Sequence, residues 1–97
     1  MQSKNKKAPT AAERQHIVRV KSLPCSVCDD AGPCDAHEIK QGQWATAVAL
    51  CKSCHDGPLL GLHGQRRMWN LKKMEEIDAL AVTVQRLLID QHRTTKC

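Results

Sequence analysis

A chain of 97 residues has room for one domain and not for two. Its large aromatic side chains are two tryptophans, so the core is expected to be thin and to need a metal for stability. The formal charge of +5 fits a phosphate-bearing partner and a surface charged only for solubility equally well. The lack of a long apolar run or a signal-peptide pattern leads us to expect no membrane partner.

The N-terminal segment is predicted to be a flexible basic arm over residues 1–9, with one domain following over residues 10–97. The arm is polar, unpatterned and rich in lysine. Thr10 and Glu13 then have the spacing of a capping box, in which a hydroxyl and a carboxylate each satisfy a free backbone donor. This pattern predicts a helix over residues 11–22, which a proline ends.

The middle of the chain alternates cysteine pairs with extended segments. A first Cys-x-x-Cys pair is followed by a turn rich in Asp, Gly and Pro. Two extended segments are predicted at residues 34–39 and 47–50, joined by a hairpin loop over residues 40–44. A second Cys-x-x-Cys pair comes directly after them.

The C-terminal half is predicted to be helical. A helix or turn should begin at His55, but glycines and a proline interrupt it soon afterwards. A short helix is expected over residues 65–71 and a longer one over residues 74–92. Apolar residues recur every three or four positions in the longer helix and form one stripe, which we interpret as the core contact, with a dimer seam as the alternative. The stripe consists of Met74, Ile77, Leu80, Ala81, Val84, Leu87 and Leu88.

Four of the six cysteines form the two pairs, Cys25 with Cys28 and Cys51 with Cys54. Thiolates at this spacing are typical of a tetrahedral structural zinc site, and they suit it better than the alternative, a disulfide scaffold. The order of pair, hairpin, pair and helix is that of a treble-clef zinc domain, whereas a zinc ribbon would carry less helix. The predicted fold class is therefore α+β: a small zinc-bound treble-clef domain with flanking helices, in a reducing cytoplasm.

The sequence resembles the HNH, or ββα-metal, endonuclease family at residues 36–39 (Ala-His-Glu-Ile), at residues 49–55 and at His63. A closer resemblance, to the Ref-type RecA-dependent nucleases of temperate phages, adds the Leu-Pro-Cys motif at the first pair, residues 36–42, residues 61–67 and the closing helix. This resemblance implies a metal-dependent endonuclease that cuts DNA where a RecA filament has paired strands during phage recombination. It implies DNA and the RecA filament as partners, the cytoplasm of a bacterial host as location, and no small-molecule substrate.

The resemblance also implies the catalytic residues. It assigns His37, His55 and His63 as ligands of a catalytic Mg²⁺ or another divalent ion, and it places His37, Glu38 and His63 in the chemistry. The general base stays open, because the family has a second histidine where this chain has Glu38, and because the usual asparagine is missing near Thr46. Either Glu38 is the base, or His37 is the base and Asp35 is a ligand.

Two basic groups are predicted to contact DNA phosphates. The first lies in the arm and the second after the histidines: Lys4, Lys6 and Lys7, and then Arg66, Arg67, Lys72 and Lys73. One alternative function is a non-catalytic zinc module that binds nucleic acid. Another is a protein-interaction zinc domain that uses the apolar stripe as its binding face.

Overall fold

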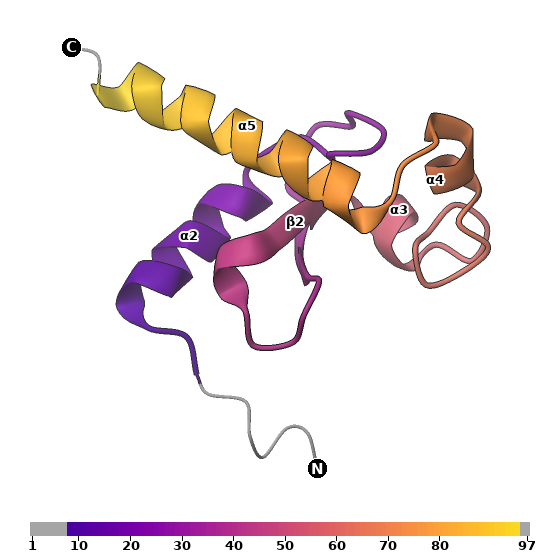
Figure 1. Cartoon of the computed structure of the whole chain (residues 1–97), viewed down its shortest axis with the longest axis horizontal. Helices are drawn as coiled ribbons and strands as arrows, with labels where there is room; N and C mark the ends of the chain where they lie inside the picture. Colours follow the sequence, from indigo (N-terminus) through magenta and orange to yellow (C-terminus); the bar gives the residue numbers. More distant parts are fainter. Residues whose placement is uncertain (1–7, 96–97) are drawn as a thin grey trace.

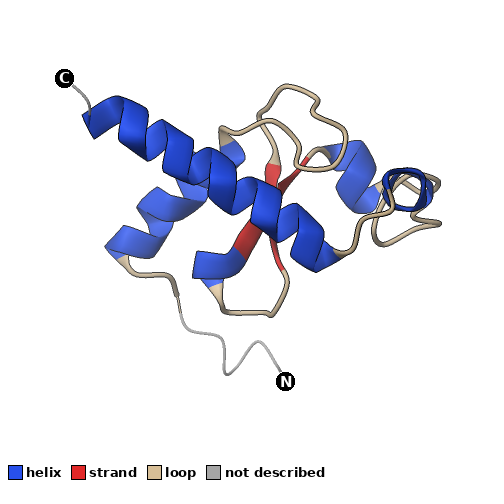
Figure 2. Ribbon diagram, turned by 45° about the horizontal axis from the view of Figure 1, so that its top comes forward, coloured by secondary structure: helices blue, strands red, loops and turns tan. Residues whose placement is uncertain are grey.

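Four α-helices and one two-stranded hairpin make up the chain over residues 8–95, the part that this computed structural model describes, with side chains described as far as residue 90. The elements are α2 (Ala11–Lys21), β1 (Asp35–Glu38), the 3-10 helix η1 (Trp44–Thr46), β2 (Ala47–Leu50), α3 (Lys52–Asp56), α4 (Arg67–Lys72) and α5 (Glu76–Thr95). The long helix α5 crosses the hairpin, with α2 beside them and with α3 and α4 at the opposite end (Figures 1 and 2). The predicted α+β class is confirmed at this level.

Helix α2 forms where its capping box predicts it. The Glu13 N–H donates to the Thr10 hydroxyl at 3.1 Å, and the Thr10 N–H donates to Oε1 of Glu13 at 2.8 Å. Ser22 is the C-cap, so the helix ends one residue earlier than expected. The prediction held because both of its signals are local.

The hairpin sets two polar side chains on the same face of β1. The strands pair antiparallel, with Asp35 opposite Leu50 and His37 opposite Val48. Because successive side chains of a strand point to opposite faces, Asp35 and His37 share one face while Glu38 takes the other. Both extended segments are confirmed, the first being one residue shorter at each end. The 3-10 turn η1, just before β2, was not predicted.

Helix α3 begins at Lys52, so the expected start at His55 was wrong by three residues. The reason is the second cysteine pair itself. Cys51 is the N-cap, and its sulfur accepts the N–H of Cys54 at 3.4 Å. A sulfur therefore supplies the cap that the usual hydroxyl or carboxylate signals would announce. The two later helices begin at Arg67 and Glu76, each two residues after its expected start.

The apolar stripe predicted on α5 is only partly the core contact. Over residues 76–90, where side chains are described, the buried residues of this helix are Ala79, Thr83 and Leu87. By contrast, Ile77 and Leu88 from the predicted stripe are 67 % and 60 % exposed. The prediction followed the largest apolar side chains, but the face against β2 carries small ones, which let the helix lie close to the strand.

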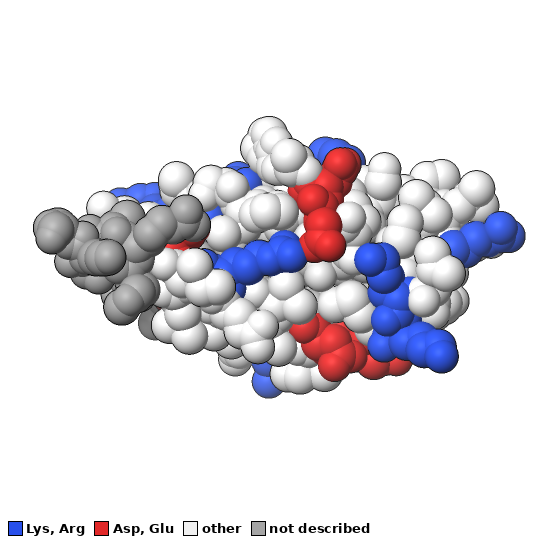
Figure 3. Space-filling view, turned by 90° about the horizontal axis from the view of Figure 1, so that it is seen from above, with Lys and Arg blue, Asp and Glu red and all other residues white. Residues whose placement is uncertain are grey.

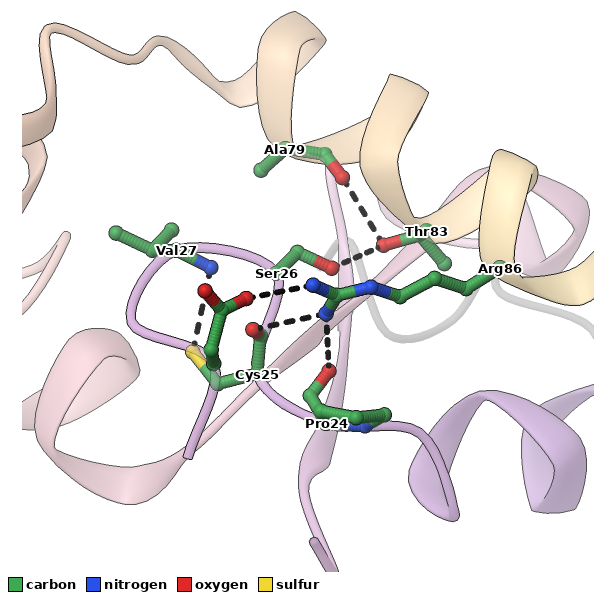
Figure 4. A network of polar contacts seen from close by, with 8 residues as sticks. Pro24, Cys25, Ser26, Val27, Ala79, Thr83 and Arg86 are labelled. Carbon is green, nitrogen blue, oxygen red and sulfur yellow. Dashed lines mark hydrogen bonds and ion pairs between the residues drawn. The ribbon is translucent and has the colours of Figure 1, made fainter. Parts of the chain in front are cut away.

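A buried hydroxyl network joins α5 to β2 and to the first cysteine pair, and its contacts with the pair are drawn in Figure 4. The Thr83 hydroxyl donates to the Ala79 carbonyl at 3.0 Å, accepts the Ala49 N–H at 3.3 Å and lies 2.7 Å from Oγ of Ser26. One turn later, the Arg86 guanidinium donates to the carbonyls of Pro24 and Cys25 and to the carboxylate of Asp29. That hydrogen bond holds the pKa of Asp29 below its usual value. The first pair is thus fixed to the long helix by polar contacts.

We expect Thr83→Val to lower the free energy of unfolding by about 1–3 kcal/mol, because it leaves the Ser26 hydroxyl and the Ala49 N–H buried without their partner. Thr83→Ser is the matched control, since it keeps the hydroxyl and removes one methyl group, at a cost of about 0.8 kcal/mol. Urea unfolding of the zinc-loaded proteins measures both. A valine variant as stable as the serine variant would contradict the role assigned to the network.

Candidate metal centres

The four paired cysteines meet in one cluster, as the sequence predicts. The sulfurs of Cys25, Cys28, Cys51 and Cys54 all lie within 4.8 Å of one another, and those of Cys28 and Cys51 are 3.7 Å apart. Four sulfurs at about 2.3 Å from a tetrahedral zinc are about 3.8 Å from each other. The cluster, hereafter the cysteine cage, therefore fits a zinc ion.

The electrostatics of the cysteine cage favour a cation. Burial raises the pKa of Cys28 to about 11 and also raises that of Cys54, with the neighbouring Cys25 sulfur adding to both effects. Burial acts on Cys25 as well, but backbone N–H groups of Cys28, Cys51 and Val27 outweigh it and lower the pKa of Cys25. Negative charge is thus favoured at one sulfur and opposed at its neighbours. A divalent ion removes this conflict.

Cys34 lies close to the cysteine cage but outside the group of four. It is buried, and burial together with the charges of Cys25 and Cys51 raises its pKa to about 11. Among the described cysteines none is in a disulfide. The described residues therefore give no support to the alternative of a disulfide scaffold.

A second cluster brings together three histidines that the sequence singled out. His37 comes from β1, His55 from α3 and His63 from the loop after α3, and their ring nitrogens offer donors within 4.8 Å of one another. The ring centroids are 5.0–5.6 Å apart. His37 is 9 % exposed, His55 is half-buried and His63 is exposed. This histidine cluster therefore opens to solvent on the side of His63.

The loop that carries His63 is closed on itself by backbone contacts. The His63 N–H donates to the His55 carbonyl at 3.2 Å, and the next residue back, Leu62, donates to Cys54. A Cβ on Gly61 would lie 2.6 Å from the nitrogen of Gly57, so glycine is required for this close approach. The buried Trp69 adds a further tie, since its indole N–H donates to the Cys54 carbonyl at 2.8 Å. Trp69 is therefore part of the core and ties α4 to α3.

Two carboxylates contact the histidine cluster from outside. Asp35 Oδ2 lies 3.0 Å from Nδ1 of His55 and 3.3 Å from the ammonium of Lys52, and these contacts lower the pKa of Asp35, the His55 hydrogen bond most. Glu76 Oε2 lies 2.6 Å from Nε2 of His37. Metal-binding histidines commonly donate their second ring N–H to such carboxylates. The alternative role of Asp35 as a ligand also has a geometric basis, because Asp35, His55 and Asp56 form a third group of donors.

Glu38 is not part of the group that the histidines form. It lies on the opposite face of β1, and its carboxylate accepts the Gly42 N–H at 2.7 Å across the hairpin loop. The carboxylate that sequence reasoning missed is Glu76, which is 39 residues from His37 along the chain. An acidic residue such as Glu76 is common at the start of a helix because the helix dipole favours it there. The sequence therefore did not indicate that Glu76 contacts His37.

The basic residues are partly outside the described chain. Lys4, Lys6 and Lys7 precede residue 8 and fall outside the described residues. Arg66 lies over the Trp69 ring at 5.6 Å and pairs with Glu75 at 3.4 Å. The other members of the second group follow on or just after α4: Arg67, Lys72 and Lys73. On the face drawn in Figure 3, acidic side chains separate the basic ones, so that face is mixed in charge.

Comparison of the chain with protein-family models, with curated proteins and with solved structures finds no match. No helix among the described residues has the length and apolar character needed to cross a bilayer. Four thiols are the donor set of a structural zinc site, and three imidazoles are a donor set that leaves positions open on an ion.

Proposed function

We propose that this chain is a metal-dependent DNA endonuclease of the HNH type, with a treble-clef fold around a structural zinc. One observation carries the proposal: three histidines converge from β1, α3 and the following loop, and one of them, His55, directly follows Cys54 of the cysteine cage in the chain. A pure zinc-binding module has no need of this second donor set. The order of two strands and a helix also matches the ββα arrangement of that family.

The donor atoms of the histidine cluster favour a transition-metal ion. Imidazole nitrogen is a preferred ligand of Zn²⁺, Ni²⁺ and similar ions, whereas Mg²⁺ is bound mainly by oxygen. His37, His55 and His63 would hold the ion, and Mg²⁺ remains a candidate if Asp35 takes part. When bound, such an ion polarises a phosphodiester and stabilises charge on the leaving oxygen.

The chain's own residues supply orientation and proton transfer. Because the Gly42 N–H holds the carboxylate of Glu38, the role of proton acceptor moves toward the histidine cluster itself. A general base must reach a water molecule beside the scissile phosphate. His63 is the exposed imidazole of the three, so it has the access that this role or an open ligand position requires.

The proposed partners are DNA and a RecA filament, in the cytoplasm of a bacterial host. The lysine-rich arm and the basic residues of α4 are proposed to contact phosphates rather than base edges. The Ref-like motifs at residues 36–42 and 61–67 are the basis for proposing that the substrate is DNA paired by RecA during phage recombination.

The second candidate function is a zinc module that binds nucleic acid without cutting it. The position of Glu38 favours this alternative, because the residue at the family's base position contacts a turn and not the histidine cluster. Such a module would bind DNA with an affinity that falls steeply with salt. A protein-interaction domain would neither cut DNA nor bind it in this salt-dependent way.

The test is incubation of the zinc-loaded protein with supercoiled and single-stranded DNA, with and without an active RecA filament. Separate reactions contain Mg²⁺, Mn²⁺, Co²⁺ or no added ion. We expect nicking that depends on the added ion and increases where the filament has paired the strands. Salt-sensitive binding with no cutting under any condition would select the non-catalytic module.

A further inference from the structure

We infer that Glu76 is a positioning residue for the histidine cluster, one that fixes the His37 ring so that Nδ1 is the nitrogen offered to a metal ion; this inference rests on the proposed function. Oε2 of Glu76 lies 2.6 Å from Nε2 of His37. A neutral imidazole has one N–H and one lone pair, and a carboxylate accepts only from the N–H. The proton is therefore held on Nε2.

The position of Glu76 is set by the fold. It is the first residue of α5, whose register is fixed by the buried hydroxyl of Thr83 and by buried Ala79. The Asp78 carboxylate accepts the N–H of Glu75 at 2.8 Å and closes the start of the helix. A helix N-terminus also favours an ionised carboxylate. Glu76 is thus already in place beside His37.

A second histidine has the same kind of partner. Asp35 contacts Nδ1 of His55, which leaves Nε2 of that ring available, just as Glu76 leaves Nδ1 of His37. Two of the three rings thus each have a carboxylate against one nitrogen and the other nitrogen left for an ion. Carboxylate partners of this kind also raise the basicity of a ligating imidazole. Among the described residues, no carboxylate bonds to His63.

The first test is a Co²⁺ titration of protein whose cysteine cage is already filled with zinc, followed by visible absorption and calorimetry. We expect Glu76→Ala to weaken Co²⁺ binding at the histidine cluster by roughly 10–100-fold. The Co²⁺ affinity of Glu76→Gln should lie between those of wild type and Glu76→Ala, because the amide oxygen still accepts from Nε2 of His37 but carries no charge. The matched control is Glu75→Gln, which removes the same charge from the neighbouring residue, exposed and paired with Arg66. We expect the control to change the affinity by less than about twofold.

The second test reads the His37 ring directly, by ¹⁵N NMR of the imidazole nitrogens with the histidine cluster free of metal. Wild type and Glu75→Gln should carry the proton on Nε2, and Glu76→Ala should show a mixture of tautomers. Zinc content of the cysteine cage reports whether each variant is folded, and Glu76→Gln serves if the alanine variant is not. The inference is overturned by a Glu76→Ala protein that matches the Glu75→Gln control in either measurement, or by wild type that takes up no Co²⁺ at the histidines.

These readouts separate this inference from the proposed function, because neither requires cleavage. A wild-type protein that cuts no DNA, but whose Co²⁺ affinity drops in Glu76→Ala, would remove the nuclease proposal and keep the role of Glu76. If wild type cuts DNA but Glu76→Ala binds Co²⁺ as tightly as the Glu75→Gln control, the nuclease proposal is kept and the role of Glu76 is removed.

Discussion

Loss of zinc from the cysteine cage should unfold this domain. A structural zinc contributes roughly 10–16 kcal/mol in zinc-finger peptides at neutral pH, as much as the whole stability of a small domain. The cage joins the segment before β1 to the start of α3, and its buried members Cys25 and Cys54 lie inside the core cluster. Metal analysis should find one tightly held zinc at these sulfurs, and a Cys25→Ser/Cys28→Ser protein should lose its cooperative melting transition by circular dichroism.

The matched control for that experiment is Cys34→Ser, because Cys34 is buried near the cage but is not one of its four sulfurs. We expect this variant to keep its zinc and its cooperative transition. The pH dependence has a definite sign. Since the pKa values of Cys28 and Cys54 are raised, zinc must displace protons from them, so the affinity for zinc falls as the pH is lowered. Two results would show that the cysteine cage does not hold the fold together. One is a Cys34→Ser variant that loses its zinc and its melting transition as the Cys25→Ser/Cys28→Ser protein does, and the other is a double variant that stays folded without zinc.

The parts of this fold that sequence reasoning predicted are those whose signals are close together in the chain. The capping box of Thr10 and Glu13 spans one helical turn, and each cysteine pair spans four residues. Both patterns determine local geometry whatever lies around them. The convergence of the histidines was also expected, but through a family resemblance and not through spacing.

The parts that were missed depend on contacts between distant segments. The face of α5 that is buried was not the most apolar one, because small residues such as Ala79 let the helix approach β2. The partner of His37 lies 39 residues away, where the sequence shows only an acidic helix start. Glu38 was a candidate base by its position beside His37, but adjacent residues of a strand face opposite ways. Pairings of this kind are set by packing of whole elements, which a single sequence does not encode in a short pattern.

Replacing His63 by alanine should abolish DNA cleavage while leaving the fold and most of the DNA affinity intact. In either proposed role, as a ligand or as the base, His63 is the exposed imidazole of the cluster and the one that substrate reaches first. Loss of one such electrostatic contribution typically lowers the rate by on the order of 10²–10³, and by more if the ion itself is lost. The rate of supercoiled-plasmid nicking, in the ion that supports wild-type activity, measures this effect.

The structural consequences of His63→Ala should be small, because its side chain is exposed and its loop is held by backbone contacts, including the N–H that donates to the His55 carbonyl. Those contacts do not use the imidazole, and the cysteine cage draws its donors from other residues. Gln85→Ala, an exposed substitution on α5 outside both clusters and both basic groups, is the control and should cut DNA at the wild-type rate. Cleavage by His63→Ala at the wild-type rate would move the active site to the remaining donors, His37, His55 and Asp35. An unfolded variant with an empty cysteine cage would make His63 a structural residue, since a side chain that only serves chemistry cannot be required for zinc to be held elsewhere.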